Sequence, residues 1–87
     1  MAANEFTVTD LRRLLRKAAG EEMGSDATIL DATFENLGFE SLALLETSAL
    51  IQREFGVRLD ESALDETLTP RGLIDSVNAK LAPTEAL

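Results

Sequence analysis

A serine lies at the start of a run of helix-forming residues in the stretch FENLGFESLALLET, residues 34 to 47. The chain has no histidine and no cysteine. Thiol nucleophiles, histidine general bases, thiolate zinc sites and Ser-His-Asp triads are therefore absent. Because Ser41 has none of these catalytic partners, any thioester or acid–base chemistry at this serine must be supplied from outside the chain.

Two interpretations of Ser41 remain open from its local sequence. As an N-cap, its oxygen would accept a hydrogen bond from a first-turn amide and stabilise the helix by about 1 kcal/mol. As an attachment point for a phosphate-bearing group, it would use the free amides and positive dipole end of a helix start, at about 0.3–1 kcal/mol. Glu35, Glu40 and Glu46 would repel an added phosphate, so they are better explained as contacts for basic partner enzymes.

The serine is positioned by a predicted helix from Ser41 to Phe55, which ends at Gly56. One stripe of this helix, which should face the core, is formed by Leu44, Ser48, Ile51 and Phe55, with Thr47 at its edge. A second face carries Leu42, Leu45 and Ala49 beside Glu46. A small bundle would cover part of this second face, and Leu42 is the better candidate for an exposed contact.

The two core-side hydroxyls, Thr47 and Ser48, also have two interpretations. Each hydroxyl can return a hydrogen bond to the carbonyl four residues earlier. Alternatively, the hydroxyls make a cleft beside the helix tolerant of a polar ligand.

The rest of the chain predicts two further main helices and one short one. The spacing of Leu11, Leu14, Leu15 and Ala18 predicts a helix near residues 8 to 19, capped by Thr7 and Asp10. Thr69-Pro70 starts a last helix, and residues 61 to 66 form a short one that packs Ala63 and Leu64. We therefore expect an all-α fold, a small four-helix bundle.

A long loop, residues 21 to 40, separates the first two main helices. Its apolar residues are expected to hold it against the bundle, namely Ile29, Phe34, Leu37 and Phe39. Residues 33 to 37 are expected to form a brief helical turn closed by Gly38. Loops of this length are usually functional or mobile, and this one leads directly to Ser41.

The charge and composition of the chain restrict the functional classes to which it can belong. The net charge is −8, and residues 21 to 66 hold twelve acids against two bases. Such a surface repels nucleic acid and anionic membranes and attracts basic protein surfaces, although acids also simply keep a small domain in solution. No signal peptide, membrane span or calcium loop is recognisable, so we expect a cytoplasmic protein with no metal site. We also expect it to be a monomer.

The run LGFESLALLET resembles the modification motif of acyl carrier proteins, in which Gly-x-Asp-Ser-Leu opens the second helix. The resemblance extends from about residue 7 to residue 82. It is closest to the discrete carriers of type II, aromatic polyketide synthases, which share the following Phe55-Gly56-Val57 and Thr69-Pro70-Arg71 sequences. Glu40 replaces the usual aspartate. The resemblance implies a single acyl-carrier domain over residues 1–87, with a helical core at about 7–82 and flexible termini.

The resemblance also implies a carrier rather than an enzyme. Ser41 would bear 4′-phosphopantetheine donated by coenzyme A, and malonyl units and growing polyketides would ride on its thiol. Partner enzymes would contact Glu40, Leu42, Leu45, Glu46 and Ala49. The implied partners are a phosphopantetheinyl transferase, a malonyl acyltransferase, a ketosynthase with its chain-length factor, a ketoreductase and a cyclase or aromatase. The alternatives are a fatty-acid or aminoacyl carrier and an unmodified acidic helical interaction module.

Overall fold

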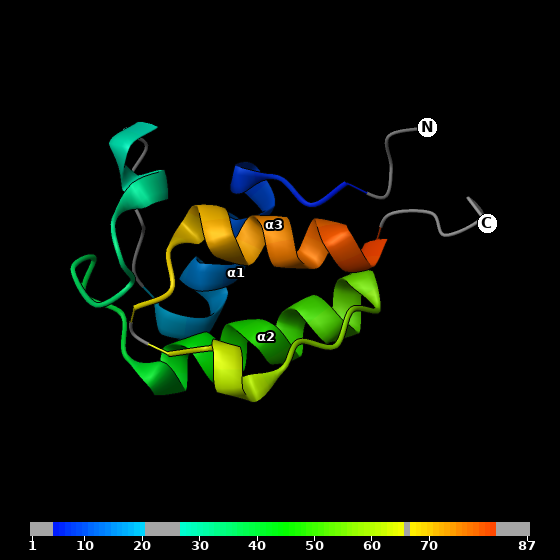
Figure 1. Cartoon of the computed structure of the whole chain (residues 1–87). Coiled ribbons are helices and arrows are strands. Elements are labelled where there is room, and N and C mark those ends of the chain that lie inside the picture. The colour runs from blue at the N-terminus through cyan, green and yellow to red at the C-terminus, as the bar shows by residue number, and fades with distance from the viewer. Residues whose placement is uncertain (1–4, 21–26, 66, 82–87) are drawn as a thin grey trace.

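The computed structural model describes residues 5–20, 27–65 and 67–81, and these contain helices and no strands (Figure 1). The helical elements follow in the order α1 (Val8–Ala19), η2 (Ala27–Asp31), α2 (Ser41–Phe55), η3 (Glu61–Ala63) and α3 (Pro70–Leu81), where η marks a 3-10 helix. The all-α prediction is confirmed. The flexible termini that we expect fall on residues 1–4 and 82–87, which lie outside the described residues.

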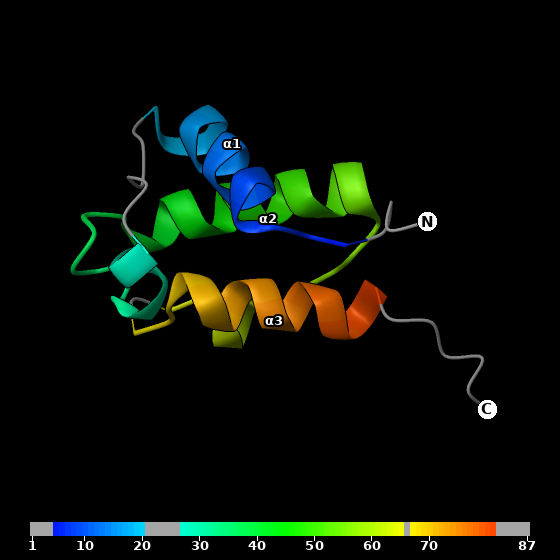
Figure 2. The same ribbon diagram turned by 90° about the horizontal axis from the view of Figure 1, so that it is seen from above.

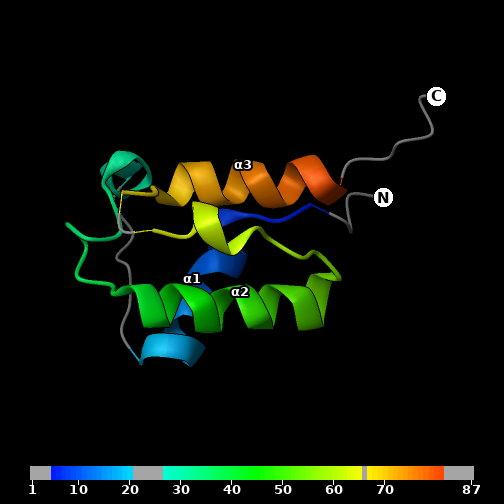
Figure 3. The same cartoon turned by 60° about the horizontal axis from the view of Figure 1, so that its bottom comes forward.

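The three α-helices enclose one core. Helices α2 and α3 run in the same direction, and α1 crosses them steeply (Figures 1 and 2). The connection from α2 to α3 returns along both helices and carries η3 between them (Figure 3). This return places the start of α3 at the same end of the molecule as the start of α2, where the long loop also arrives.

Helix α1 begins and ends as its sequence predicts. The Thr7 hydroxyl accepts a hydrogen bond from the Asp10 amide at 3.2 Å, and the Asp10 carboxylate accepts one from the Thr7 amide at 3.0 Å. This reciprocal pair is a capping box. Gly20 ends the helix with φ 74°, a left-handed conformation that suits glycine.

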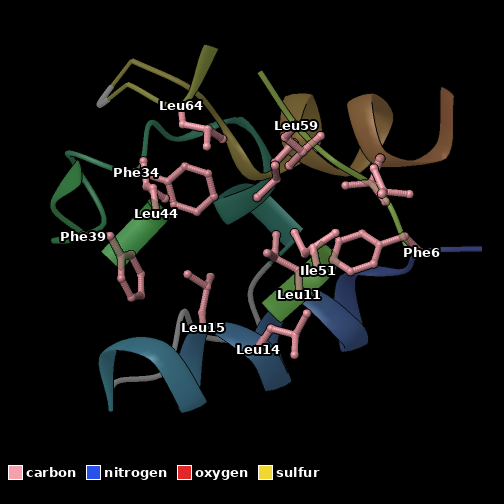
Figure 4. Packing of buried hydrophobic residues seen from close by; sticks show 13 residues of the cluster. Phe6, Leu11, Leu14, Leu15, Phe34, Phe39, Leu44, Ile51, Leu59 and Leu64 are labelled. Carbon is pink, nitrogen blue, oxygen red and sulfur yellow. The ribbon is translucent and has the colours of Figure 1, made fainter. Parts of the chain in front are cut away.

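The core consists of thirteen buried apolar side chains from the three α-helices, the segment before α1 and the segments that connect the helices. Those labelled in Figure 4 point into the space between the helices. The full set is Phe6, Leu11, Leu14, Leu15, Phe34, Phe39, Leu44, Ile51, Val57, Leu59, Leu64, Leu73 and Val77. Burying one such side chain contributes about 1.5–3 kcal/mol. Most of the free energy that holds the helices together therefore comes from burial of this cluster.

The start of α3 is closed by Thr69, as predicted. The Thr69 hydroxyl accepts a hydrogen bond from the Gly72 amide at 3.0 Å. A Cβ on Gly72 would lie 3.3 Å from both Leu68 Cδ1 and Thr69 Oγ1, so the glycine permits this close packing. Further along α3, Leu73 and Val77 are buried and Ile74 is partly buried.

Phe6, just before α1, is tied to the far part of α3. Its amide donates to Asn78 Oδ1 at 2.7 Å, and Asn78 Nδ2 donates to the Phe6 carbonyl at 2.9 Å. The Phe6 ring packs edge-on against Phe55 with centroids 5.0 Å apart. One side-chain amide thus satisfies both backbone groups of a residue 72 positions away.

The long loop is held against the bundle by its apolar residues, as predicted. Phe34 and Phe39 are buried, and the Phe34 amide donates to the Leu68 carbonyl at 2.8 Å. An ion pair between Arg71 Nε and Asp31 Oδ1, 2.9 Å apart, joins the loop to α3. The η2 helix inside this loop was not predicted, because its sequence lacks a clear apolar period.

The short helix predicted over residues 61–66 is wrong in length. Asp60 caps it by accepting from the Ser62 amide at 3.1 Å, and Leu64 is buried, but the helix ends at Ala63. The Asp65 carboxylate then accepts a hydrogen bond from the Thr67 amide at 2.9 Å. This local turn competes with a continuation of the helix. The predicted packing of the Ala63 side chain falls outside the described side chains.

Candidate functional site

The approach to Ser41 is fixed by a tight turn and a buried ring. The predicted turn is present: the Leu37 amide donates to the Thr33 carbonyl at 3.0 Å, and Gly38 has φ 91°. Phe39 is 3% exposed, and its amide donates to the Phe34 carbonyl at 2.9 Å. Because the residue two positions earlier is anchored, an exposed Ser41 is presented from a fixed backbone.

Ser41 is the first residue of α2 and not its N-cap, so the N-cap interpretation is wrong. The cap position belongs to Glu40, in an extended conformation (φ −92°, ψ 167°), and its side chain makes no capping hydrogen bond. Glutamate is not among the residues that cap well. The amides of Ser41, Leu42 and Ala43 also have no carbonyl partner inside the helix. The helix start is therefore open.

The predicted partner-binding residues all lie on the exposed surface of α2 or at its cap. Leu42, Leu45, Glu46 and Ala49 follow the spacing i, i+3, i+4 and i+7, which places them on one stripe. Leu42 is 65% exposed and Leu45 38% exposed. Both are therefore outside the core, and the bundle does not wrap Leu45. The stripe offers apolar surface beside a carboxylate, one residue from Ser41.

The two hydroxyls predicted on the core side of α2 have different environments. Thr47 is fully buried, and its hydroxyl donates to the Ala43 carbonyl at 2.8 Å. Its hydrogen bond is thus satisfied inside the helix, as the first interpretation predicts. Ser48 is only partly buried and lines a groove of about 710 Å³ beside the α2–α3 connection. Gln52 and Arg58 add polar groups to this groove, and Leu45 and Leu59 add apolar ones.

Two carboxylates outside the site carry charge-assisted contacts that sequence reasoning missed. Arg13 Nη1 lies 2.9 Å from Glu54 Oε1 and lowers the pKa of that carboxyl. The hydrogen bond from Arg71 likewise lowers the pKa of Asp31. Both pairs join elements far apart in the sequence. Local patterns gave no signal for either partner.

Two further searches cover the described part of the chain only. None of its helices is long and apolar enough to cross a membrane. Within the same residues, no group of three or more metal-binding side chains comes together.

The described residues form a small all-α bundle with an exposed serine at an open helix start, which is the arrangement that the resemblance to carrier proteins predicts. The family model described as "Phosphopantetheine attachment site" matches residues 10–77. Together with the relatives described next, this match shows that the chain belongs to the acyl carrier proteins of polyketide synthases.

The relatives match nearly the whole chain. The chain is 53% identical over 83 residues to the monensin polyketide synthase acyl carrier protein of Streptomyces virginiae, covering 94% of each. It is 49% identical to the granaticin polyketide synthase acyl carrier protein of Streptomyces violaceoruber, covering 88% of this chain and 93% of the relative.

Solved structures agree with the sequence relatives. The acetyl actinorhodin acyl carrier protein of Streptomyces coelicolor matches with a TM-score of 0.77 at 42% identity, over 100% of both chains. The holo form of the actinorhodin carrier matches with a TM-score of 0.75 at 41% identity, over 95% of this chain and 96% of that one.

These findings confirm the carrier prediction. The protein is a non-catalytic carrier, and its cofactor is a covalently attached 4′-phosphopantetheine arm. It acts together with synthase partner enzymes. The alternative of an unmodified interaction module is thereby set aside.

Proposed function

We propose that Ser41 is the attachment point of the phosphopantetheine arm, and that the arm carries malonyl units and growing chains in aromatic polyketide synthesis. One observation carries the assignment of the serine. Its hydroxyl is exposed on the first residue of α2, where the cap side chain leaves the first amides open. Those amides and the positive end of the helix dipole suit a phosphodiester.

The attachment step needs a phosphopantetheinyl transferase with magnesium, because the chain has no histidine that could act as a general base for the serine. Ser41 Oγ forms a bond to the phosphorus next to the pantetheine, and the pyrophosphate bond of coenzyme A breaks. Adenosine 3′,5′-bisphosphate leaves, and the serine proton passes to the transferase or to water. The thiol at the end of the arm then supplies the thioester chemistry that a cysteine-free chain lacks.

The partners of the loaded arm are proposed to dock at the stripe beside Ser41. They are the malonyl acyltransferase, the ketosynthase with its chain-length factor, the ketoreductase and the cyclase or aromatase. The proposed contacts are Glu40, Leu42, Leu45, Glu46 and Ala49. An exposed apolar side chain beside carboxylates that have no ion pair within the described part of the chain favours brief contacts with basic enzyme surfaces, since electrostatic steering raises the association rate.

The groove beside the α2–α3 connection supports a polar cargo. Ser48, Gln52 and Arg58 can donate hydrogen bonds to keto oxygens, whereas Leu45 and Leu59 cover methylene groups. NMR spectra of two loaded forms of the protein test this idea, one with a ketide mimic on the arm and one with a saturated chain of equal length. The ketide mimic should shift the Ser48 and Gln52 amides more. Shifts caused by the saturated chain alone would contradict it.

The attachment proposal is tested by intact mass. Incubation with coenzyme A and a broad-specificity phosphopantetheinyl transferase should add one phosphopantetheine to the wild-type protein and none to Ser41→Ala. A matched control is Ser76→Ala, an exposed serine on α3, which should gain the arm normally. A mass gain that survives Ser41→Ala would disprove the assignment.

Loading assays test the polyketide function of the arm directly. A polyketide carrier should accept malonyl from the acyltransferase and pass it to a ketosynthase pair, whereas an aminoacyl carrier would be charged by an adenylating enzyme. A fatty-acid carrier would instead sustain saturated chain growth. We also propose that the chain acts as a cytoplasmic monomer formed by one carrier domain, which sedimentation of the holo-protein and cell fractionation would check.

A further inference from the structure

The face of α2 that turns toward α1 carries its charges in a fixed order. Glu46 and Arg53 are seven residues apart, so they share a face about two turns, or roughly 10 Å, apart along the axis. Leu42 lies one turn before Glu46, and Ala49 lies between the two charges. From the Ser41 end, the order is therefore apolar, acidic, apolar, basic.

Two adjoining hollows follow this face along the seam between α1 and α2. Their volumes are about 240 and 310 Å³, and Ala18 of α1 and Glu46 of α2 line both of them. The first hollow reaches Leu42 beside Ser41, and the second ends between Lys17 and Arg53. In the view of Figure 2, α1 and α3 flank α2 on opposite sides. The seam and the groove at the α2–α3 connection meet at Ala49, which lines both of them.

Glu46 and Arg53, the two charges of this face of α2, differ from the neighbouring charges of the seam in having no ion-pair partner among the described residues. The Glu54 carboxylate forms ion pairs with Arg13, at 2.9 Å, and with Lys17, at 3.4 Å. Arg53 is exposed, and the described part of the chain offers it no ion pair or hydrogen bond. Glu46 is likewise exposed and unpaired among those residues. Both charges can therefore pair with groups of a partner.

We propose that this seam face is a docking surface with two opposite charges, for the synthase enzyme that takes the acyl chain from the arm. The seam face consists of Leu42, Glu46, Ala49 and Arg53 with Lys17. Its partner presents a basic group to Glu46 and an acidic group to Arg53, about 10 Å further along α2. This inference depends on the proposed carrier function of Ser41.

The physical reason is that a purely acidic surface attracts basic partners without fixing their rotation. With an opposite charge at the far end, a partner that docks the wrong way round brings its basic group to Arg53 and its acidic group to Glu46. This orientation is unfavourable because like charges repel. At 0.1 M salt the screening length is about 10 Å, so a partner in contact feels the two ends separately. The pair of charges therefore orients the partner so that its active site faces the arm on Ser41.

The test compares two charge reversals in the holo-protein. Arg53→Glu changes the far end of the seam face, whereas Lys80→Glu makes the same charge change at an exposed position on α3. The measured quantity is kcat/KM for acyl transfer to a ketosynthase and chain-length factor pair of a type II polyketide synthase. We expect Arg53→Glu to lower it about 5- to 10-fold in 50 mM salt and Lys80→Glu to change it less than 2-fold.

Further measurements exclude a folding effect. Arg53→Lys should retain at least half of the wild-type kcat/KM, and the loss in Arg53→Glu should shrink to less than 2-fold in 0.5 M salt. Equal losses for Arg53→Glu and Lys80→Glu, or a loss that salt does not reduce, would overturn the docking surface while the carrier function stands. If the wild-type holo-protein transferred no acyl chain, the proposed function would fail and this inference with it.

Discussion

Helices α1 and α2 begin after residues with nearly the same backbone conformation, yet their first amides find different partners. Thr7 has φ −114° and ψ 170°, and Glu40 has φ −92° and ψ 167°. The Thr7 hydroxyl and the Asp10 carboxylate close the start of α1 with a capping box. The Glu40 side chain bonds none of the α2 amides. The difference therefore lies in the side chains and not in the backbone.

This contrast separates stability from function within one small domain. A capping residue typically contributes about 1 kcal/mol, which α1 gains and α2 forgoes. The start of α2 is instead held by packing, because Phe39 just before it and Leu44 just inside it are both buried. Packing from the core leaves the polar end free. Such a free end suits the proposed attachment of a phosphodiester at Ser41.

The largest expected effect comes from Ser41→Ala at the open start. The variant should lose arm attachment completely, while its free energy of unfolding changes by less than about 0.5 kcal/mol, because Ser41 is exposed and caps nothing. Intact mass and urea denaturation measure the two quantities. A loss of stability of 1 kcal/mol or more would show that the serine also supports the helix and would break the contrast.

Thr7→Ala at the closed start should do the opposite. Removal of the hydroxyl leaves the Asp10 amide unpaired and should cost about 1 kcal/mol of unfolding free energy in urea denaturation. The rate of arm attachment should stay within about 2-fold of wild type. Thr9→Ala, an exposed neighbour on the same helix, is the control and should change stability by less than about 0.5 kcal/mol. Equal effects of the two variants would argue against the capping box.

Glu40→Asp should make the start of α2 more like that of α1. Aspartate is short enough to accept a bond from a first-turn amide, so the unfolding free energy should rise by about 0.5–1 kcal/mol. Glu35→Asp, at an exposed position in the preceding turn, should leave it unchanged. If Glu40→Asp gave no gain, the open amides of α2 would already be satisfied by something other than a cap.

Acid should slightly lower the stability of the fold, because it breaks the ion pair that joins the start of α3 to the long loop. Arg71 holds the pKa of Asp31 below its ordinary value of 3.8, so the ion pair stabilises the fold above that value. Its contribution is lost as the pH falls below about 4 through the lowered pKa. Asp31→Asn should therefore lose less stability than wild type between pH 7 and pH 3, as followed by thermal melting. Glu35→Gln serves as a control and should behave like wild type. A drop for Asp31→Asn as large as that of wild type would rule out this pair as a source of acid sensitivity.

The sequence by itself determined the three α-helices and placed the serine at the start of α2. The apolar periods of residues 8–19 and 41–55, the glycine stops and the Thr7–Asp10 box act within a few residues, so local rules predict them. Local rules failed at η2, which has no clear period, and at the end of η3, where Asp65 forms a competing turn. They also assigned the cap of α2 to Ser41, one residue too far along the chain, although the rank of glutamate as a cap pointed to an open start.

Only the tertiary structure decided which charges are neutralised and where the surface is hollow. Glu54 meets Lys17 across 37 positions, Asp31 meets Arg71 across 40, and Asn78 meets Phe6 across 72. No local period encodes such pairs, because they exist only after the core has brought distant elements together. The same packing leaves Arg53, two turns after Glu46 along the seam of α1 and α2, without an ion pair among the described residues. The sequence therefore determined which helices form, and the packing of the helices determined what surface surrounds the start of α2.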